Sequence, residues 1–184
     1  MASNSTHPAA LYKLRKVTRI SALVILLLVV AGFFMPVDYR VERSVVIQAP
    51  RDVVYQNIFQ GDRLPNWMFI QDGKVSSFEG VLSKGDSVAL VYDNTSDQGV
   101  LSVIESSESA IRFDVRPKSK VNLVHNQIVL QNDKGSTLVK WTIEGNLSAG
   151  LLSPYLAMFA NNIAGSNFEF SLQKLKEQVE RHNQ

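Results

Sequence analysis

The segment Thr-Leu-Val-Lys-Trp-Thr-Ile-Glu-Gly, residues 137–145, alternates apolar and polar side chains with a period of two. Val139, Trp141 and Ile143 fall on one face of an extended chain, and a lysine, a threonine and a glutamate fall on the other. This alternation is typical of an antiparallel strand that is buried on one side and solvated on the other. Residues 110–116 repeat the pattern, so the sequence predicts a sheet with one apolar face.

Further extended segments lie along the chain, and glycine, asparagine or serine residues separate them. A helix is expected over 52–59, after the Ala49-Pro50 pair, and a helical turn broken by Pro65 follows it. Together these patterns predict an α+β domain built on an antiparallel sheet of about seven strands. The expected strands are 39–48, 74–79, 87–92, 100–105, 110–116, 121–130 and 137–145.

The C-terminal segment 154–181 is the long element left to cover the apolar face of this sheet. Ser153 at a cap position and Pro154 at the first helical position predict a helix. Its two halves carry apolar stripes on nearly opposite faces, which a straight helix cannot both bury against one sheet. We therefore expect a kink or restart at Gly165; the alternative is that the second, opposite stripe contacts a membrane or another subunit. The first stripe is Leu152, Leu156, Phe159 and Ile163, and the second is Phe168, Leu172, Leu175 and Val179.

The N-terminal part of the chain predicts where the protein resides. Residues 20–37 contain no charged side chain, and extension to Val17 gives about the 20 residues that cross ~30 Å of hydrocarbon as a helix. We divide the chain into a short polar basic tail (1–16), a transmembrane anchor (17–37) and a folded domain (38–184). The basic cluster before the anchor predicts a single-pass protein with a cytoplasmic N-terminus and a periplasmic or extracellular domain. A signal peptide cleaved before Gly32 is the alternative.

Three segments resemble those of a known superfamily. The opening VERSVVIQAPRDVVYQNI (41–58), the strand GSTLVKWTIEG (135–145) and the closing helix FEFSLQKLKEQVE (168–180) occur in matching order and spacing. They resemble the START-like (SRPBCC) superfamily, and most closely its polyketide cyclase/dehydrase-like branch, which includes members with a leading transmembrane helix. The resemblance implies a helix-grip fold, with a curved sheet wrapped on the long C-terminal helix. It also implies a hydrophobic pocket between sheet and helix, suited to lipids, sterols or polyketides.

One region departs from the resemblance. Many members carry paired tryptophans after the first helix, whereas LPNWMF (64–69) keeps only Trp67. We therefore expect the mouth of the pocket to differ in shape and ligand.

Nine residues are candidates for the pocket. Aromatic side chains suit an apolar ligand, although most such residues simply fill a core. His125 is a candidate acid or base if it faces the cavity, and the alternative is a histidine bonded to a neighbour elsewhere. Asn162 interrupts the apolar face of the long helix, either to orient a ligand or because it meets solvent. The candidates are Trp67, Phe69, Tyr92, Phe113, His125, Trp141, Tyr155, Phe159 and Asn162.

Several kinds of chemistry find no support in the sequence. There are no cysteines, and the three histidines at 7, 125 and 182 have no metal-ligand spacing, so no metal or cofactor is expected. A net charge of +2, with a basic cluster of Lys13, Arg15, Lys16 and Arg19 ahead of the most apolar stretch, makes nucleic acid a poor partner. The prediction is a membrane-anchored protein that binds a hydrophobic small molecule or lipid. The alternatives are a cyclase or dehydratase using the same pocket and a protein-binding stress or assembly factor.

Overall fold

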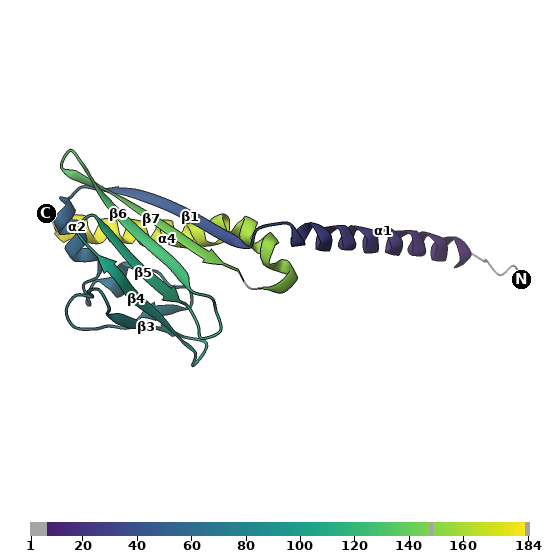
Figure 1. Cartoon of the computed structure of the whole chain (residues 1–184), viewed down its shortest axis with the longest axis horizontal. Coiled ribbons are helices and arrows are strands. Elements are labelled where there is room, and N and C mark those ends of the chain that lie inside the picture. The colour runs from purple at the N-terminus through teal and green to yellow at the C-terminus, as the bar shows by residue number, and fades with distance from the viewer. Residues whose placement is uncertain (1–6, 148, 183–184) are drawn as a thin grey trace, which may run out of the picture.

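The computed structural model describes residues 7–147 and 149–182, with side chains described for 11–147, 149–159 and 164–181. A long N-terminal helix precedes a seven-stranded sheet, and a second long helix ends the chain (Figure 1). The helices are α1 (His7–Phe33), α2 (Arg51–Ile58), α3 (Leu64–Trp67), the 3-10 helix η1 (Gly150–Leu152) and α4 (Ser153–His182). The strands are β1 (Asp38–Ile47), β2 (Gly73–Val75), β3 (Ser87–Tyr92), β4 (Gln98–Ser106), β5 (Ala110–Arg116), β6 (Val124–Asp133) and β7 (Ser136–Asn146).

The sheet is antiparallel throughout, with strand order β1-β7-β6-β5-β4-β3-β2, and it curls around α4 (Figure 1). The predicted helix-grip fold is therefore confirmed. The alternating face of β7 lies inward, where Val139, Trp141 and Ile143 are buried. Leu172, Leu175 and Val179 of α4 pack on this face and are also buried, so the second predicted stripe covers the sheet.

The hairpin between β6 and β7 sets the register of the central strands. Asp133 pairs with Ser136, and the two residues between them, Lys134 and Gly135, both have positive φ (46° and 94°). Two positive φ values are typical of a type I′ turn, whose twist matches that of the flanking strands. Strand β6 consequently runs to Asp133, three residues past the predicted end at 130.

Strand β2 is shorter than predicted, ending at Val75 instead of 79. Ser76 still donates its backbone N–H to the Ala89 carbonyl at 2.9 Å, but the chain then turns toward the loop after α2. There the Phe78 carbonyl lies so close to Gly61 that a Cβ on this glycine would sit 2.0 Å from the oxygen. Residues 77–79 therefore pack close to Gly61 instead of continuing the strand.

Helix α4 runs without interruption through Gly165, so the predicted restart was wrong. Gly165 instead provides space for Arg43, whose guanidinium crosses the helix there; a Cβ would lie 2.0 Å from its Nη2 atom. The Arg43 Nε–H then donates to Glu169 Oε1 at 2.7 Å. The glycine thus permits an ion pair between β1 and α4.

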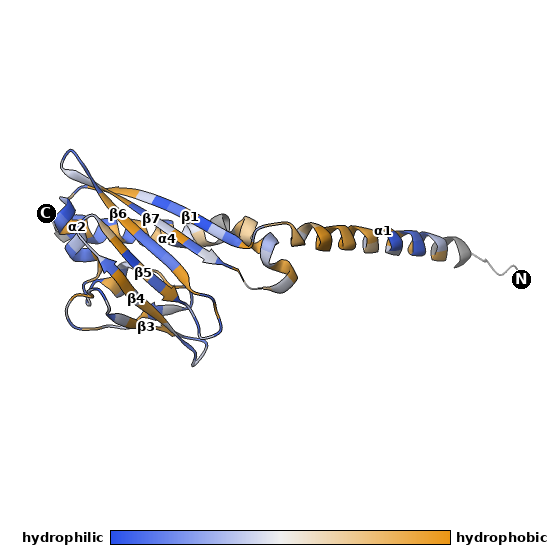
Figure 2. Cartoon of the chain, in the orientation of Figure 1, coloured by the Kyte–Doolittle hydropathy of each residue, from blue (hydrophilic) through white to orange (hydrophobic). Residues whose placement is uncertain are grey.

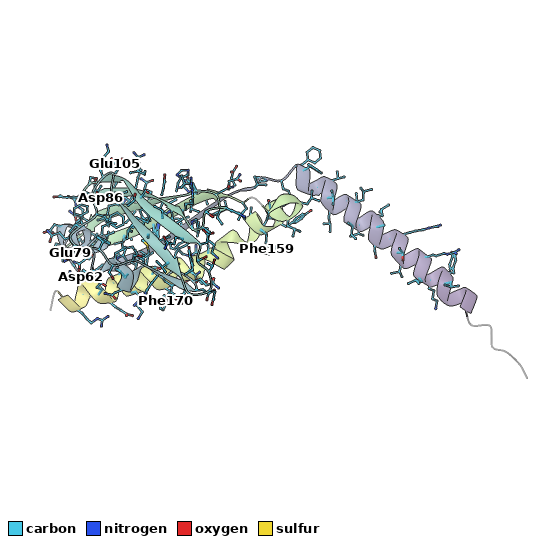
Figure 3. All side chains as sticks on the ribbon, turned by 90° about the horizontal axis from the view of Figure 1, so that it is seen from below. Asp62, Glu79, Asp86, Glu105, Phe159 and Phe170 are labelled. Carbon is cyan, nitrogen blue, oxygen red and sulfur yellow. The ribbon has the colours of Figure 1, made fainter. Side chains whose placement is uncertain are left out.

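The start of α4 extends beyond the sheet (Figure 1). Met158 and Phe159 are 65% and 54% exposed (Figure 3). Leu152, Leu156 and Phe159 of the first stripe are exposed, whereas Leu172, Leu175 and Val179 of the second stripe are buried against the sheet. The alternative that the second stripe contacts a membrane or another subunit was therefore wrong.

Helix α1 projects from the domain, and its residues Leu11–Phe33 are long and apolar enough to cross a membrane (Figure 2). A signal sequence near the N-terminus has the same properties. Only residues 34–37 separate α1 from β1. The end of α1 touches the start of α4, where the Tyr155 hydroxyl donates a hydrogen bond to the Leu28 carbonyl.

Candidate ligand-binding site

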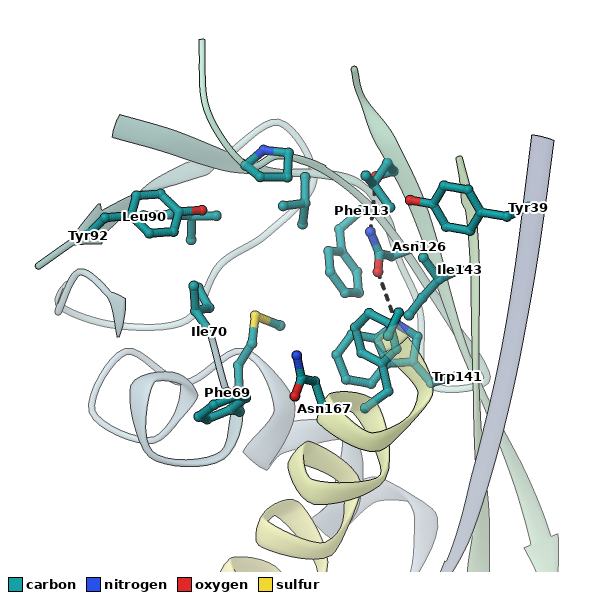
Figure 4. A pocket seen from close by; sticks show the side chains of 16 residues that line it. Tyr39, Phe69, Ile70, Leu90, Tyr92, Phe113, Asn126, Trp141, Ile143 and Asn167 are labelled. Carbon is teal, nitrogen blue, oxygen red and sulfur yellow. Dashed lines mark hydrogen bonds between the residues drawn. The ribbon is translucent and has the colours of Figure 1, made fainter. Parts of the chain in front are cut away.

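A cavity of about 250 Å³ lies between the sheet and the middle of α4 (Figure 4). Helix α4 supplies Ala164, Asn167 and Phe168, and the segment after α3 supplies a second wall. The strands supply most of the remaining surface, which is largely apolar. The wall after α3 is Met68, Phe69 and Ile70, and the strands and the residue after β5 contribute Tyr39, Leu90, Tyr92, Phe113, Val115, Pro117, Val124, Asn126, Trp141 and Ile143.

Asn126 places a buried carboxamide among these apolar side chains. Its Oδ1 atom accepts the Trp141 indole N–H at 3.1 Å, and its Nδ2 donates to the Val124 carbonyl at 3.0 Å (Figure 4). Because one partner is a pure donor and the other a pure acceptor, the two bonds fix the orientation of the amide. They use one of its two N–H groups and one of its two lone pairs, which leaves one donor and one acceptor for a ligand.

Trp141 is held by aromatic neighbours as well as by this hydrogen bond. Its ring centroid lies 4.9 Å from that of Phe168, 5.8 Å from Trp67 and 6.1 Å from Phe113. Tilted and edge-to-face arrangements at these distances are favourable for aromatic pairs. The indole is only 3% exposed yet forms part of the cavity wall, so one side of it meets open space and the other a packed core.

Two tyrosines add hydroxyl groups to the wall. Tyr39 pairs directly with Gly145 across β1 and β7, and a Cβ on that glycine would lie 2.5 Å from the phenol oxygen. Burial raises the pKa of Tyr39 above its ordinary value, and burial followed by the charge of Asp97 raises the pKa of Tyr92. Both phenols therefore stay protonated at neutral pH and are able to donate hydrogen bonds.

The cavity lies at the end of the sheet that is nearest to α1. Tyr39 is the second residue of β1, which follows α1, and Ile143, Val124 and Val115 lie at the adjacent ends of β7, β6 and β5. Antiparallel pairing brings these strand ends together, because the start of one strand faces the end of the next. The site is thus at the end of the sheet that faces α1, although no described residue of α1 lines it.

Four of the nine predicted residues line this cavity, namely Phe69, Tyr92, Phe113 and Trp141. Trp67 lies behind Trp141 in the core and donates its indole N–H to the Ile58 carbonyl at 3.0 Å. Tyr155 contacts α1, and Phe159 is exposed beyond the sheet. The side chain of Asn162 lies outside the described residues. Whether any of these residues contacts a ligand stays a prediction.

His125 lies on the opposite face of the sheet, away from the cavity. Its side chain is 63% exposed, and its Nδ1 atom lies 2.8 Å from Asp114 Oδ1 on the neighbouring strand. The cause is the phase of β6, because Val124, Asn126, Ile128 and Leu130 point inward and His125 therefore points outward. The histidine belongs to the polar outer face, as the second interpretation of it expected.

The same alternation could have identified Asn126, which the sequence analysis missed. Asn126 shares its phase with three apolar neighbours, so a period-two interpretation places it on the buried face. Tyr39, Ala164 and Asn167 were also missed. Nothing in the sequence marks them, because only the packing of α4 against β1 brings them to one cavity.

Among the residues with described side chains, the sixteen that line the cavity include no aspartate, glutamate, lysine, arginine or histidine. Its polar atoms are amides and phenols, which offer hydrogen bonds without net charge. Among residues with described side chains, no group of three or more histidine, aspartate or glutamate residues is placed to hold a metal ion.

No protein-family model matches the sequence, and no curated protein is a significant match to it. Solved structures do share the fold. Protein CV1439 from Chromobacterium violaceum superposes with a TM-score of 0.60 at 16% identity, over 77% of this chain and 98% of the other. Ara h 8.0201 superposes with a TM-score of 0.56 at 11% identity, over 77% of this chain and 97% of the other. DynU16, of the dynemicin biosynthetic locus, superposes with a TM-score of 0.55 at 16% identity, over 77% of this chain and 47% of the other. At these identities the similarity shows the fold alone, and that fold is consistent with the START-like superfamily.

Proposed function

We propose that this protein is a membrane-anchored binding protein that holds a hydrophobic small molecule or lipid in the cavity between the sheet and α4. The observation that carries the proposal is the cavity itself, which is mostly apolar and has a few fixed polar groups. Ligand sites in proteins combine these two properties, because apolar walls supply affinity and convergent polar groups supply orientation. Pockets for drug-sized ligands measure roughly 300–1,000 Å³, so a cavity of about 250 Å³ suits a small ligand or one part of a longer lipid.

The polar groups of the wall favour a ligand without charge. A carboxylate or amine buried here would lack an ionised partner, and burial of an unpaired charge is strongly unfavourable. Asn126, Asn167 and the Tyr39 phenol instead match a hydroxyl, ester or carbonyl group. We therefore expect neutral ligands such as alcohols, esters, sterols or polyketide-like ketones to bind better than fatty acids.

The anchor is part of this proposal. A cleavage before Gly32 would remove Leu28, and with it the hydrogen bond from Tyr155 that ties α1 to α4. The contact between α1 and α4 therefore supports a retained helix over a cleaved signal peptide. The basic residues Lys13, Arg15, Lys16 and Arg19 support a cytoplasmic N-terminus, with the domain on the other side of the membrane.

The proposal is tested with the full-length protein extracted in detergent. Native mass spectrometry should show a co-purified apolar molecule, and a fluorescent fatty alcohol should bind more tightly than the matching fatty acid. The variant Ala164→Trp should fill the cavity and weaken binding of the alcohol by about tenfold or more. Gln173→Trp, which adds the same side chain to an exposed position of α4, is the control.

Two outcomes contradict the proposal. The first is wild-type protein that carries no lipid and binds neither probe. The second is Ala164→Trp protein that melts and binds like the wild type, because the probe would then occupy another place.

A further inference from the structure

A second surface of the molecule has a composition that the pocket does not explain. The apolar tip, Gly150–Phe159, comprises η1 and the start of α4. Four of its large apolar side chains are more than half exposed: Leu151, Leu152, Met158 and Phe159. No charged residue occurs anywhere between Glu144 and Glu169. Exposed apolar surface of this kind marks contact with a membrane or with another protein.

The tip lies directly beside the last turns of α1 (Figure 3). Tyr155 donates its hydroxyl to the Leu28 carbonyl, and its ring lies against Gly32, where a Cβ would sit 3.4 Å from the ring. Leu28 is five residues before the end of α1 at Phe33, which is about 7.5 Å along a helix that rises 1.5 Å per residue. The tip therefore overlaps the end of the apolar helix instead of standing clear of it.

We propose that the apolar tip is embedded in the same leaflet of the lipid bilayer in which α1 ends, as a second membrane contact. Helices that lie in the membrane interface insert their apolar face by roughly 5–10 Å, which matches the overlap of the tip with α1. The bilayer is the favoured partner because the patch continues the surface of α1 and exposes no charge along this stretch. Asn161 and Asn162 follow the tip and mark the first polar positions beyond it.

The position of the tip also sets the position of the pocket. Ala164 and Asn167, which line the cavity, follow Phe159 by roughly 8 and 12 Å along the axis of α4. The first charged groups along α4 lie at this level, where the Arg43 guanidinium packs on Gly165 and pairs with Glu169. The α4 wall of the cavity consequently lies at the level of the lipid headgroups, and ligand exchanges with the bilayer directly. This last step rests on the proposed binding function.

The absence of cysteine from the chain permits a direct test. Single cysteines are introduced at Met158, at Leu23 in α1 and at Ser109 in the exposed β4–β5 turn, and each is labelled with bimane. The full-length variants are reconstituted in phosphatidylcholine vesicles, and quenching by aqueous iodide is compared with quenching by doxyl-labelled lipid. The Met158 label should behave like the Leu23 label, with severalfold weaker iodide quenching than the Ser109 label and strong quenching by the doxyl lipid.

The possible results separate the partners. A Met158 label that iodide quenches as strongly as the Ser109 label overturns the proposal, since the tip would then lie in water. A Met158 label shielded from both quenchers also overturns it, because a second copy of the chain or another protein would then cover the tip. A Leu23 label open to iodide removes the premise that α1 spans the bilayer.

A second measurement tests ligand exchange. The double variant Leu152→Glu and Met158→Glu should fold like the wild type, because both side chains are exposed, but should take up a fluorescent fatty alcohol from vesicles severalfold more slowly. Val81→Glu, at an exposed apolar position outside the tip, should take it up at the wild-type rate. Uptake by the double variant at the wild-type rate contradicts the exchange route. Binding of the alcohol in detergent is measured in parallel, so that failure of the pocket and failure of the tip give different results.

Discussion

Trp141 is the residue at which packing and ligand binding should separate most clearly. Replacement of a buried tryptophan by alanine costs about 3–5 kcal/mol in unfolding free energy. Trp141 contacts three aromatic rings on its packed side but faces the cavity on the other, where fewer contacts are lost. We therefore expect Trp141→Ala to cost about 3 kcal/mol, at the lower end of the range.

A domain of this size loses roughly 2–4 °C of Tm per kcal/mol, so Trp141→Ala should melt ~6–12 °C below the wild type. Near-ultraviolet circular dichroism of the detergent-solubilised full-length protein measures the shift. In the same preparation, the affinity for a fluorescent fatty alcohol should change severalfold, because the variant enlarges the cavity and removes the donor that orients Asn126.

Matched phenylalanine variants provide the control. Trp67→Phe and Trp141→Phe each remove one indole N–H bond, to the Ile58 carbonyl and to Asn126 respectively, at a cost of about 1–2 kcal/mol. Only Trp141→Phe should alter probe affinity. The chain has two tryptophans, so Trp67→Phe protein also reports on Trp141 alone, and its emission should shift when ligand binds. A Trp141→Ala protein that melts at the wild-type temperature would refute the packing argument. Unchanged probe affinity in both Trp141 variants would show that this residue is not part of the site.

Three further predictions concern other parts of the molecule. Gly165→Ala should raise the free energy of unfolding by less than the ~1 kcal/mol expected from helix propensity, because the new Cβ displaces Arg43 from Glu169. The full increase should appear in an Arg43→Ala background. Equal increases in both backgrounds would argue against the close approach of Arg43 to Gly165. Burial raises the pKa of Tyr39, so the folded protein keeps a proton that the unfolded chain loses above about pH 10, and stability should fall as pH rises beyond that point. The melting temperature should fall less steeply with rising pH for Tyr39→Phe than for the wild type. Identical slopes would contradict the assignment of this effect to Tyr39. Alkaline phosphatase fused after Gln184 should be active outside the cytoplasm, whereas cytoplasmic activity of a reporter at this position would reverse the topology.

The sequence predicted the sheet well where alternation was strong. Strands β3 and β5 have the bounds that the pattern predicted, and β7 differs by one residue at each end. The prediction failed at Gly165. In the sequence, a glycine that provides space for a side chain from another element cannot be distinguished from a glycine that ends a helix. That distinction depends on Arg43, which is more than 120 residues away and reaches Glu169 only in the folded state.

The site was predicted less well than the fold, for a related reason. Phe69, Tyr92, Phe113 and Trp141 are large and aromatic, so composition alone drew attention to them. Asn126 was detectable from the phase of its strand, and the same phase would have placed His125 on the outer face. Ala164 and Asn167 line the cavity only because of where α4 crosses the sheet, which no local pattern encodes.

Residues 34–37, the four that join α1 to β1, have a consequence for how binding is measured. Four extended residues reach at most ~14 Å, so an anchored domain stays against the lipid surface and never samples the bulk solution. For a ligand that partitions into the bilayer, occupancy is then governed by its mole fraction in the membrane, and its aqueous solubility becomes irrelevant. Half-saturation in vesicles should therefore stay at one ratio of ligand to lipid when the whole suspension is diluted.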